Sequence, residues 1–402
     1  MNILQICNKS PYPPKEGGPI AMHNLADGLM MQGHNVDILT MNTFKFRVDV
    51  DMLPVDYRFK TNFTAVYVNT RIKYLDAFLN LFSSKSYHIQ RFDSQEFRNT
   101  LIQILKNKNF DIVQLETIYV APYIDTIRKY SKAQIVLRSH NVEHLIWQRY
   151  AKTISNPVKR KYVKYLTEKL KKYEMTVFGQ VDGIAAITNV DADYIRKAGF
   201  STPVVTVPFG LNMSKCIAMP QKDGNISFFH LGSMDWMPNQ EAIRWFLEKS
   251  MPQISKRFPE TMVYLAGRNI PSWLYSYKFP NLKVIGEVED AAEFMQSKTV
   301  MFVPLLSGSG VRVKIIEGMA LGKTIISTSV GAEGIHYTDG ENLLIADTPE
   351  AFTEKFKLCI DDPGLCTRIG HNARKLIEKE YDISVTTTNL IDLYLSLINN
   401  SK

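Results

Sequence analysis

Short apolar runs and stretches of helical period alternate along the first half of the chain. The runs that we expect to form buried strands are NILQIC (2–7), HNVDILT (34–40), FTAVYVN (63–69), DIVQLE (111–116), QIVLRSHN (134–141), GIAAIT (183–188) and PVVTVPF (203–209). A loop rich in Pro and Gly follows the first run and leads into a helical pattern from about Ile20 to Met31. Buried strands that alternate with helices predict an α/β fold with a parallel, doubly wound sheet.

The same alternation restarts in the second half and predicts a second open sheet. Its expected strands are ISFFHLGS (226–233), TMVYLAG (261–267), LKVIGEV (282–288), TVMFVPLL (299–306) and TIISTSV (324–330). Helical patterns begin near Asn239 and cover 311–321. Near the end of the chain, Leu390, Leu393 and Leu397 share one face of an expected amphipathic helix.

The segment 209–225 interrupts this rhythm, and we expect it to be a linker. It would join an N-terminal domain, 1–208, to a C-terminal domain, 226–382, each with a Rossmann-like sheet. Ligands of such sheets bind at the loops that follow the strands. We therefore expect the two domains to face each other across a ligand-binding cleft.

Composition and charge narrow the class of protein. The 402 residues exceed the usual length of one domain, and 45% apolar with 22% charged residues is ordinary for a globular chain. A net charge of +8 suits anionic small substrates or an acidic membrane surface better than dedicated nucleic-acid binding. The cysteines are scattered without a C-x-x-C pair, which predicts reduced thiols in a cytoplasmic protein: Cys7, Cys216, Cys359 and Cys366. We see no signal peptide and no apolar run long enough to span a membrane, so any membrane contact is expected to be peripheral.

The stretch SGSGVRVKIIEGMALGKT (307–324) contains parts of two phosphate-binding motifs and satisfies neither. A Walker loop has four residues between its glycines, whereas only three separate Gly318 from Gly322. A Walker loop also lies between a strand and a helix, whereas GKT here follows an expected helix and precedes an expected strand. A dinucleotide fingerprint requires a third glycine where Val313 stands. The spacing therefore disfavours both a P-loop and a nicotinamide site.

The same stretch retains the features of an anion site. Gly308 and Gly310 let a ligand approach the N–H groups at the start of the following helix. Arg312 and Lys314 add positive charge there, and Glu317 shares a helix face with Lys314. Two cations with a carboxylate one turn deeper suit a nucleoside diphosphate, whose ribose hydroxyls would donate to the acid. A solvated helix with an ordinary Lys–Glu ion pair explains the spacing equally well.

The run SGSGVRVKIIEGMALGKTIISTSVGAEGI resembles the donor-binding region of the retaining family 4 glycosyltransferases, which have the two-domain GT-B fold. Other segments agree in order along most of the chain: the GG loop after the first strand, HN at the end of QIVLRSHN, HLGSMDWMPNQEAIRWF, AGRN and VIGEVED. The resemblance implies transfer of a sugar from a nucleotide-sugar donor with retention at the anomeric carbon. It also implies that the final helix, 383–402, crosses back onto the N-terminal domain.

Carried over by position, Glu317 resembles the second glutamate of the family's E-x7-E motif, which binds the nucleotide ribose. Ser309 stands where the first glutamate is usual, and this departure bears on recognition of the donor sugar. Ser233 and Asn239 stand where many members carry an arginine and a lysine for the pyrophosphate. The two cations after the glycine loop are expected to replace that charge. The combination is similar to a branch of the family with the pattern G-x-G-x-R-x-K-x-x-E.

By the same resemblance, His140 faces the donor sugar and phosphates, and it is the residue expected to act in catalysis. HNVEH (140–144) also matches the H-x-x-E-H signature of zinc peptidases, but His140 ends an expected strand and zinc requires both histidines on one helix face. A histidine whose hydrogen bonds are satisfied by nearby backbone is the third interpretation.

Gly17 and Gly18 allow close approach of donor phosphate, with a plain turn as the alternative. Backbone groups near Val288 are expected to read the nucleobase.

Two pairs of acids match the D-x-D metal motif of the other major glycosyltransferase fold: DVD (49–51) and DAD (191–193). The second opens an expected helix, where acids stabilise the free N–H groups without a metal. We expect both pairs to be structural, and we expect neither a metal ion nor another cofactor.

A basic run and an amphipathic segment suggest a membrane surface. Eight Lys or Arg and one acid lie between 152 and 172, and YLDAFLNLF (74–82) places Leu75, Phe78, Leu79 and Phe82 at helical spacing. Together they suit an anionic leaflet and a lipid-linked acceptor. A solvated helix face and packing in the core are the alternatives. No motif that reads a nucleic-acid groove supports binding to DNA or RNA.

These features predict a cytoplasmic GT-B enzyme, peripheral on the inner face of the membrane, that transfers a sugar to a saccharide or glycolipid acceptor. The helix dipole, Arg312 and Lys314 would stabilise the charge of the leaving diphosphate. No side chain can be named as the base from the sequence. Two other classes stay open: a catalytically silent nucleotide-sugar-binding protein and a GT-B epimerase, which requires no acceptor.

Overall fold

The structure is a computed structural model that describes residues 1–14, 16–218, 226–308 and 310–400. The chain divides into two compact units: unit 1 consists of Met1–Gly210 with Ile383–Lys402, and unit 2 of Leu211–Asp382. Of the expected linker, the part from 219 to 225 lies outside the described residues. Leu211 forms a parallel bridge with Asp382, so the chain enters and leaves unit 2 at neighbouring positions.

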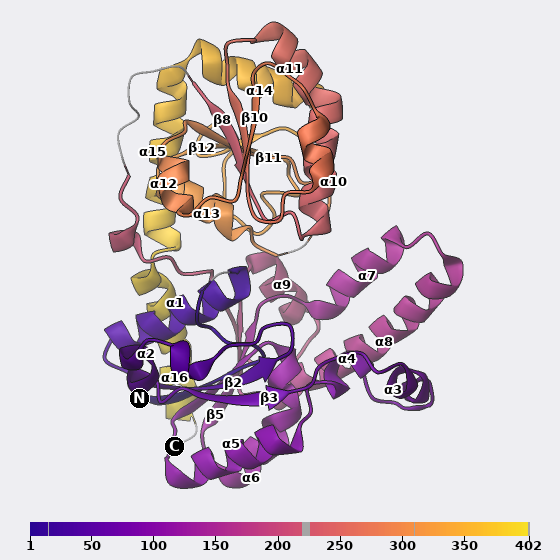
Figure 1. Cartoon of the computed structure of the whole chain (residues 1–402). Helices are drawn as coiled ribbons and strands as arrows, with labels where there is room; N and C mark the ends of the chain where they lie inside the picture. Colours follow the sequence, from indigo (N-terminus) through magenta and orange to yellow (C-terminus); the bar gives the residue numbers. More distant parts are fainter. Residues whose placement is uncertain (15, 219–225, 309, 401–402) are drawn as a thin grey trace. The chain divides into compact units, whose positions relative to one another are not determined.

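Unit 1 is built on a seven-stranded parallel sheet with the spatial order β3-β2-β1-β4-β5-β6-β7 (Figure 1). The strands are β1 (Asn2–Cys7), β2 (Asn35–Thr43), β3 (Thr64–Val68), β4 (Ile112–Glu116), β5 (Gln134–Ser139), β6 (Gly183–Ala186) and β7 (Val204–Thr206). Alternate residues of β1 and β2 enter two different apolar clusters, because successive side chains point to opposite faces of a sheet. The prediction of a parallel, doubly wound sheet is confirmed.

The helices of unit 1 complete both clusters. They are α1 (Gly17–Met31), α2 (Val55–Lys60), α3 (Tyr74–Leu79), α4 (Tyr87–Gln90), α5 (Gln95–Asn107), α6 (Ile124–Tyr130), α7 (Glu143–Thr153), α8 (Pro157–Gln180), α9 (Asn189–Lys197) and α16 (Ile383–Asn400), with 3-10 turns η1 (Val50–Met52), η2 (Asn80–Phe82) and η3 (Ile118–Tyr123). α16 packs on α1 and on β5, β6 and β7. Gly28 of α1 permits this contact, because a Cβ there would lie 2.2 Å from Thr387 Oγ1.

Unit 2 contains a six-stranded parallel sheet with the order β10-β9-β8-β11-β12-β13. The strands are β8 (Phe228–Leu231), β9 (Val263–Ala266), β10 (Leu282–Gly286), β11 (Val300–Val303), β12 (Thr324–Ser327) and β13 (Leu344–Ile345). The helices are α10 (Met237–Trp245), α11 (Met251–Arg257), α12 (Ala291–Gln296), α13 (Val313–Ala320), α14 (Pro349–Asp361) and α15 (Pro363–Glu380), with turns η4 (Met213–Lys215), η5 (Phe246–Ser250) and η6 (Ser272–Ser276). Aromatic rings fill the core, where Phe228 stacks on Phe356 with ring centroids 3.7 Å apart.

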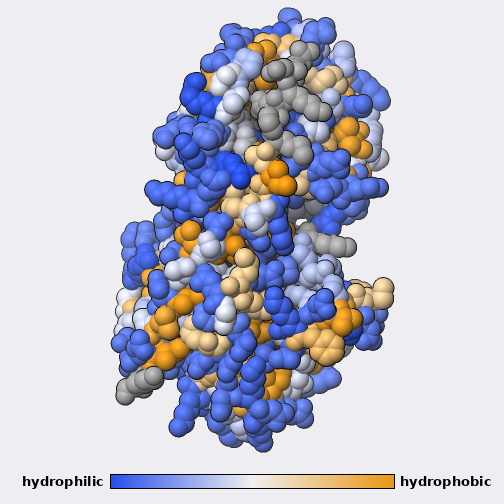
Figure 2. Space-filling model, turned by 90° about the vertical axis from the view of Figure 1, so that its left-hand side faces the viewer, coloured by the Kyte–Doolittle hydropathy of each residue, from blue (hydrophilic) through white to orange (hydrophobic). Residues whose placement is uncertain are grey.

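Both cores take up most of the large apolar side chains. The surface on the side of α1 and α2 is mostly hydrophilic, and its hydrophobic residues form small groups separated by hydrophilic ones (Figure 2). Among the helices that the structure describes, none is long and apolar enough to cross a membrane. A larger exposed apolar group on this molecule therefore requires a specific explanation.

The strand order reverses beside the first strand of each unit. The reversal lies between β1 and β4 in unit 1 and between β8 and β11 in unit 2. Open α/β sheets bind their ligands at the carboxyl ends of the strands beside such a reversal. The chemistry of each unit is therefore expected in the residues that end or follow these strands.

Candidate active site

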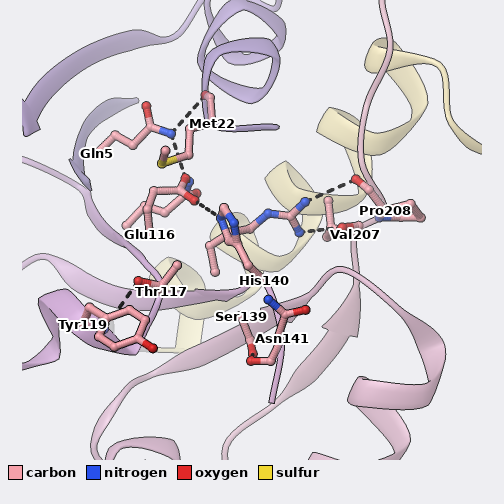
Figure 3. Close-up of polar contacts among 12 residues, drawn as sticks. Gln5, Met22, Glu116, Thr117, Tyr119, Ser139, His140, Asn141, Val207 and Pro208 are labelled. Atoms are coloured by element: carbon pink, nitrogen blue, oxygen red, sulfur yellow. Dashed lines mark hydrogen bonds and ion pairs between the residues drawn. The ribbon is translucent and has the colours of Figure 1, made fainter. Parts of the chain in front are cut away.

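In unit 1, polar side chains of three neighbouring strands meet at the carboxyl ends of β1, β4 and β5 (Figure 3). Glu116, the last residue of β4, is fully buried. Its Oε2 lies 2.6 Å from Nε2 of His140, the residue after β5, and its Oε1 accepts a 2.7 Å hydrogen bond from Nε2 of Gln5. Gln114 donates a further, short hydrogen bond to the same Oε1. Donors from three strands thus surround one buried carboxyl group.

These contacts keep Glu116 ionised although it is buried. Burial alone would raise the pKa of this carboxyl, but the hydrogen bond and charge of His140 and the charge of Arg138 hold the pKa below its usual value. An ionised carboxylate only accepts hydrogen bonds, so the proton between the two groups belongs to Nε2 of His140. The His140 side chain is 12% exposed, and its Nδ1 forms no hydrogen bond with any residue that the structure describes.

Two further buried groups complete this network. Arg138 of β5 is 2% exposed, and its guanidinium donates hydrogen bonds of 2.5 and 3.2 Å to the carbonyl oxygens of Val207 and Pro208. Burial lowers the pKa of Arg138 to about 10, which still leaves it charged at neutral pH. Tyr394 of α16 donates to Oε1 of Gln114. The last helix of the chain is therefore connected to the carboxylate through one amide.

The two histidines of HNVEH pair with different carboxylates, and so they do not share a metal ion. His144 and Glu174 are both fully buried, with Nδ1 2.5 Å from Oε2, and Nε2 of His144 lies 2.9 Å from the Tyr194 hydroxyl. Glu174 also accepts the backbone N–H groups of Glu143 and His144 at 2.9 and 3.1 Å, which fixes the start of α7 directly after His140. Within the described part of the chain, no three His, Cys, Asp or Glu side chains are placed to hold a metal ion.

Glu143 is a second unusual acid beside this site. Its Oε2 accepts a 2.9 Å hydrogen bond from the Tyr119 hydroxyl. Burial and the neighbouring Glu174 raise the pKa of Glu143 to about 7. This carboxyl group therefore exchanges its proton near neutral pH.

Gly17 and Gly18 lie in the first turn of α1, so the prediction that this helix begins about three residues later is wrong. A Cβ on Gly18 would lie 3.0 Å from Cε and 3.2 Å from Nζ of Lys9. Lys9 pairs with Glu16 at 3.7 Å and lies 4.6 Å from the centre of the Phe46 ring. The glycine pair thus makes room for a cation beside the helix start, and its contact with donor phosphate stays a prediction.

In unit 2, the loop after β11 requires glycine at Gly308. Gly308 and Gly310 have φ of +126° and +79°, in the region that other residues rarely adopt. A Cβ on Gly308 would lie 2.7 Å from Nη2 of Arg312 and 3.0 Å from Cη2 of Trp236. Ser309, the residue in place of the family's first glutamate, lies outside the described residues. The glycine therefore allows the loop to pass closely beneath two large side chains.

Arg312, Lys314 and Glu317 gather at the start of α13. Arg312 is the N-cap residue of α13 rather than part of its first turn. Its Nη1 donates a 2.6 Å hydrogen bond to Gly310 O, and its guanidinium lies 5.0 Å from the centre of the Trp236 ring. Lys314 Nζ lies 2.8 Å from Glu317 Oε2, and the two side chains are 40% and 20% exposed. The ion pair agrees with both interpretations of this spacing, the diphosphate site and the solvated helix, and does not decide between them.

The GKT segment after α13 has a structural role. Lys323 is 2% exposed and its Nζ donates to the carbonyl oxygens of Gln296 (3.2 Å) and Lys298 (2.8 Å), at the end of α12. Burial lowers the pKa of Lys323 to about 8. Gly322, with φ +71°, ends the turn after α13, and Thr324 begins β12. The segment follows a helix and precedes a strand, as predicted, so the rejection of a Walker loop is confirmed.

The loop between β8 and α10 lies beside the glycine loop. Ser233 and Asn239, where many family members carry cations, contact each other through a 2.8 Å hydrogen bond from Asn239 Nδ2 to Ser233 O. Trp236 reaches the glycine loop from this segment, and Glu241 of α10 accepts a 2.9 Å hydrogen bond from Ser307 Oγ. Trp236 and Glu241 both lie in the segment HLGSMDWMPNQEAIRWF, which resembles the family, but an individual role was predicted from the sequence for neither of them.

The D-x-D acids shape local turns. Asp49 is the N-cap residue of η1 and accepts the N–H of Asp51 at 3.1 Å. Asp191 accepts a 2.8 Å hydrogen bond from Thr188 Oγ1 in the first turn of α9, where Thr188 is the N-cap residue. These acids therefore have local structural contacts, and the expectation that neither pair binds a metal ion stays a prediction. Val288 is half-buried after the edge strand β10, and its contact with a nucleobase stays a prediction.

Glu116, Arg138 and Glu174 were not predicted from the sequence. Glu116 contacts His140 directly, and Arg138 lies beside Glu116 in the same network. Glu174 holds the start of the helix that follows His140. A signal for the first two was present, because DIVQLE and QIVLRSHN carry charged residues inside otherwise apolar strands. Charges in a strand that is buried on both faces must have partners. The identity of those partners depends on which strands are neighbours.

The chain has two Rossmann-like units, and each carries polar groups beside the point where its strand order reverses. This arrangement defines an α/β protein of GT-B type. Comparison with known proteins identifies the family. The sequence model of the family described as "Glycosyltransferase Family 4" matches residues 16–215, and that of "Glycosyl transferases group 1" matches 225–362. A 44.6 kDa protein of the cps region of Klebsiella pneumoniae is 23% identical over 390 residues, 94% of this chain and 96% of that protein. The capsular polysaccharide biosynthesis glycosyltransferase CapM of Staphylococcus aureus is 27% identical over 132 residues, 32% of this chain and 34% of that protein.

Solved structures agree on the fold. Sucrose-phosphate synthase of Thermosynechococcus elongatus matches 100% of both chains with a TM-score of 0.72 at 14% identity. Alr3699/HepE of Anabaena, solved in complex with UDP, has a TM-score of 0.68 at 11% identity and covers 98% of this chain and 100% of its own. The chain belongs to the group 1 and family 4 glycosyltransferases with the GT-B fold. It is an enzyme of hexosyltransferase type.

Proposed function

We propose that this enzyme transfers a hexose from a nucleoside diphosphate sugar to a saccharide acceptor with retention at the anomeric carbon. The observation that carries the proposal is the start of α13, where Arg312, Lys314 and Glu317 adjoin a glycine loop. In this proposal the G-x-G-x-R-x-K-x-x-E pattern is the donor site of the chain. No metal ion is required, because two cations and the helix N-terminus supply the positive charge.

The present contacts of these side chains are weak enough for a nucleotide to replace. Arg312 donates to a backbone carbonyl, whereas a diphosphate offers charged acceptors that form stronger hydrogen bonds. The partly buried Lys314–Glu317 pair is a single i, i+3 ion pair on a helix, and such pairs are worth about 0.5 kcal/mol. When Lys314 turns to a phosphate oxygen, Glu317 becomes free to accept the ribose hydroxyls. The resting ion pair is therefore compatible with a donor site.

The chemical step is a substitution at the anomeric carbon. The bond from C1 to the diphosphate oxygen breaks, and a bond from C1 to the acceptor oxygen forms on the same face. The acceptor hydroxyl proton passes to the leaving diphosphate, so the products are a nucleoside diphosphate and a retained glycoside. Arg312, Lys314 and the dipole of α13 stabilise the negative charge that develops on the leaving group.

The acceptor proposed is a growing cell-surface polysaccharide, carried on a lipid. Its support comes from the relatives, one from a cps region and one named for capsular polysaccharide biosynthesis. The donor base is open, and uridine nucleotides are the first to test because two structures of similar fold hold UDP and UDP-glucose.

Thermal shift with a panel of nucleoside diphosphates and their sugars tests the donor site, since a ligand that binds only the folded state raises Tm. We expect one base to be preferred and Arg312→Ala to weaken its binding about 10- to 100-fold, the range for one charged hydrogen bond. Arg244→Ala is the matched control, because Arg244 also lies over a tryptophan of unit 2, 4.2 Å from the Trp273 ring centre. Equal binding by Arg312→Ala and wild type would contradict the proposal.

Turnover separates the enzyme from the two other classes. Release of nucleoside diphosphate that depends on a lipid extract with saccharide acceptors is expected of the transferase. A silent binding protein releases none, and an epimerase converts the donor without an acceptor. The coupling constant of the new anomeric proton, measured by NMR, distinguishes retention from inversion.

A second proposal is that unit 1 binds an anionic membrane surface through α3 and η2. Four large apolar side chains expected either to pack in a core or to reach a membrane are exposed: Leu75 (69%), Phe78 (58%), Leu79 (57%) and Phe82 (82%). Figure 1 shows α3 on the opposite side of unit 1 from α1, beside α8. A group of four large, exposed apolar side chains favours a binding surface.

The basic helix α8 holds this apolar group in place. Buried Lys169 donates a 2.6 Å hydrogen bond to Asn80 O, and the Tyr165 hydroxyl donates to Leu81 O at 2.7 Å. The solvated-face interpretation of the basic run is therefore wrong for Lys169. The other cations of the run remain exposed or half-buried: Lys152, Lys159, Arg160, Lys161, Lys164, Lys171 and Lys172. Apolar side chains next to exposed cations suit anionic lipid headgroups over a hydrocarbon layer.

Sedimentation with vesicles tests this surface. We expect binding to vesicles of phosphatidylcholine with phosphatidylglycerol, little binding to phosphatidylcholine alone, and loss of binding in Phe78→Ser with Phe82→Ser. Phe59→Ser is the matched control, because Phe59 of α2 is 78% exposed in the same unit. Undiminished binding by the double variant would contradict the proposal.

A further inference from the structure

The imidazole of His140 has two nitrogens, and the structure assigns them different tasks. Nε2 lies 2.6 Å from the buried Glu116 carboxylate, whereas Nδ1 has no partner among the described residues. We propose that Glu116 is a positioning residue that fixes the tautomer and orientation of His140, so that Nδ1 is presented to a hydroxyl group of a sugar. The inference rests on the glycosyl transfer proposed above, and it specifies the atom through which His140 acts.

The carboxylate of Glu116 has no freedom to turn, because both its oxygens are occupied. Oε1 accepts from Gln5 and Gln114, and Oε2 is left for His140. Gln5 Nε2 also donates to Met22 O at 3.2 Å, so two acceptors fix which end of this amide carries the nitrogen. A rotation of Glu116 would leave buried donors without acceptors, which costs about 1–3 kcal/mol for each group.

The backbone around His140 is held from both sides. On one side β5 ends at Ser139, whose Oγ donates to Asn141 O at 2.9 Å. On the other side Glu174 of α8 accepts the first N–H groups of α7. One buried carboxylate therefore fixes the His140 side chain, and a second fixes the chain that follows it. Such double support holds a functional group within the narrow range of geometry that catalysis requires.

The contact with Glu116 occupies Nε2 of His140 and leaves Nδ1 as the ring nitrogen that a ligand can reach. Arg138 already supplies a buried positive charge beside the Glu116 carboxylate. Burial and the charge of Glu116 raise the pKa of Cys7 at the end of β1, so this thiol adds no charge. In the tautomer with its proton on Nε2, the imidazole accepts a hydrogen bond at Nδ1. A sugar hydroxyl is a donor of the required kind, and this hydrogen bond would orient it.

The network reaches α16, the last helix of the chain. Tyr394 is fully buried, and its hydroxyl donates to Oε1 of Gln114, whose Nε2 donates to Glu116. Removal of this hydroxyl leaves Oε1 of Gln114 without its donor, so the amide that donates to the carboxylate is held less firmly. Tyr394→Phe is therefore expected to weaken the orientation of His140 without any change in a residue that contacts substrate.

The tautomer can be measured without assuming any activity. In a 15N-labelled protein, the long-range proton–nitrogen NMR spectrum distinguishes a protonated Nε2 from a protonated Nδ1, and the signals of His140 are those lost in His140→Gln. We expect protonation at Nε2 in the wild type and a mixture of both tautomers in Glu116→Gln. A wild-type spectrum with the proton on Nδ1 would overturn the inference.

Steady-state kinetics test the role in the reaction. Glu116→Gln is expected to lower kcat about 10- to 100-fold, the range for loss of a charged hydrogen bond, and Tyr394→Phe to lower it less. Glu116→Asp, which keeps the charge, is expected to recover part of the loss. Glu143→Gln is the matched control, because it removes a carboxylate three residues from His140 that does not contact the imidazole. Wild-type kcat in Glu116→Gln would overturn the inference.

Two readouts keep this inference separate from the proposed function. The thermal shift caused by a nucleoside diphosphate reports on unit 2 and is expected to be unchanged in Glu116→Gln. If no nucleotide binds the wild type, the proposed function fails while the tautomer is still decided by NMR. The rate of donor hydrolysis without acceptor shows which sugar carries the hydroxyl that His140 contacts. If Glu116→Gln lowers this rate, the hydroxyl belongs to the donor sugar. If the hydrolysis rate is unchanged and the KM for the acceptor rises, the hydroxyl belongs to the acceptor.

Discussion

The two units have sheets of the same kind, yet their charged groups are held in opposite ways. In unit 1 the carboxylates of Glu116 and Glu174 are fully buried and surrounded by donors from the protein itself. In unit 2 the Lys314–Glu317 pair is only partly buried, with side chains 40% and 20% exposed, although the Oε2 atom of Glu317 that faces Lys314 is itself buried. Glu116 ends the strand β4 and Glu174 belongs to the helix α8, whereas Lys314 and Glu317 lie in α13, the helix that follows β11.

Burial decides which of these groups a ligand can recruit. A buried ion pair depends on its partner, because removal of one member leaves an uncompensated charge away from water. An exposed pair contributes little, so a phosphate or a ribose replaces it at small cost. The charged groups of unit 1 are therefore fixed by contacts within the protein, whereas the proposed donor-binding pair of unit 2 can change its partner at small cost.

The largest effect is expected from breaking the buried pair of unit 1. Glu174→Ala leaves His144 without its carboxylate and the start of α7 without its acceptor, and should reduce the free energy of unfolding by about 3–5 kcal/mol. Urea unfolding measures the loss, and hydrogen exchange locates it in α7 and α8. A loss of unfolding free energy below about 1 kcal/mol, the value of a surface ion pair, would contradict the proposed difference between the ion pairs of the two units.

The next effect concerns Glu143, whose pKa is raised by burial from 4.5 to about 7. The folded state binds this proton more tightly than the unfolded state, so the stabilisation is complete below pH 4.5 and is lost as the pH rises through about 7. The loss has an upper limit of about 3 kcal/mol, and partial exposure reduces it to ~2 kcal/mol. Urea unfolding between pH 5 and 8 should show a flatter profile in Glu143→Gln, and identical profiles would contradict the assignment.

A third, smaller effect is expected from Lys323→Met. The variant leaves the carbonyl oxygens of Gln296 and Lys298 without their buried donor, and should lower the free energy of unfolding by about 1–2 kcal/mol. Nucleotide affinity should stay at the wild-type value, because this lysine caps a helix and does not bind phosphate. Thermal shift with and without nucleotide measures both quantities, and weakened nucleotide binding would revive the Walker interpretation.

The smallest effect on stability is expected from Lys314→Ala, which removes only one partly exposed ion pair. The free energy of unfolding should change by less than about 0.5 kcal/mol. The affinity for nucleoside diphosphate should nevertheless fall about 10-fold, because a charged contact with phosphate is lost. If stability falls as much as in Glu174→Ala, the contrast between the two units does not hold.

The sequence indicated the parallel sheets and the charged helix start because both are local. Buried parallel strands leave a short apolar run in the sequence, and the pattern from Gly308 to Glu317 lies within one loop and one helix. The same local signals failed at α1, where a helix starting with two glycines looked like a loop. They also could not place Lys323, whose partners are 25 and 27 residues away.

By itself, the sequence determined the fold class of this protein, the family it resembles and the cluster at the start of α13. Only the tertiary structure decided what surrounds His140: Gln5 lies 111 residues from Glu116, and Tyr394 lies 280 residues from Gln114. A hydrophobic period records which face of a strand is buried, since burial acts on each element separately. Which buried charge meets which donor depends on the order of strands in the sheet, and no period along the chain encodes that order.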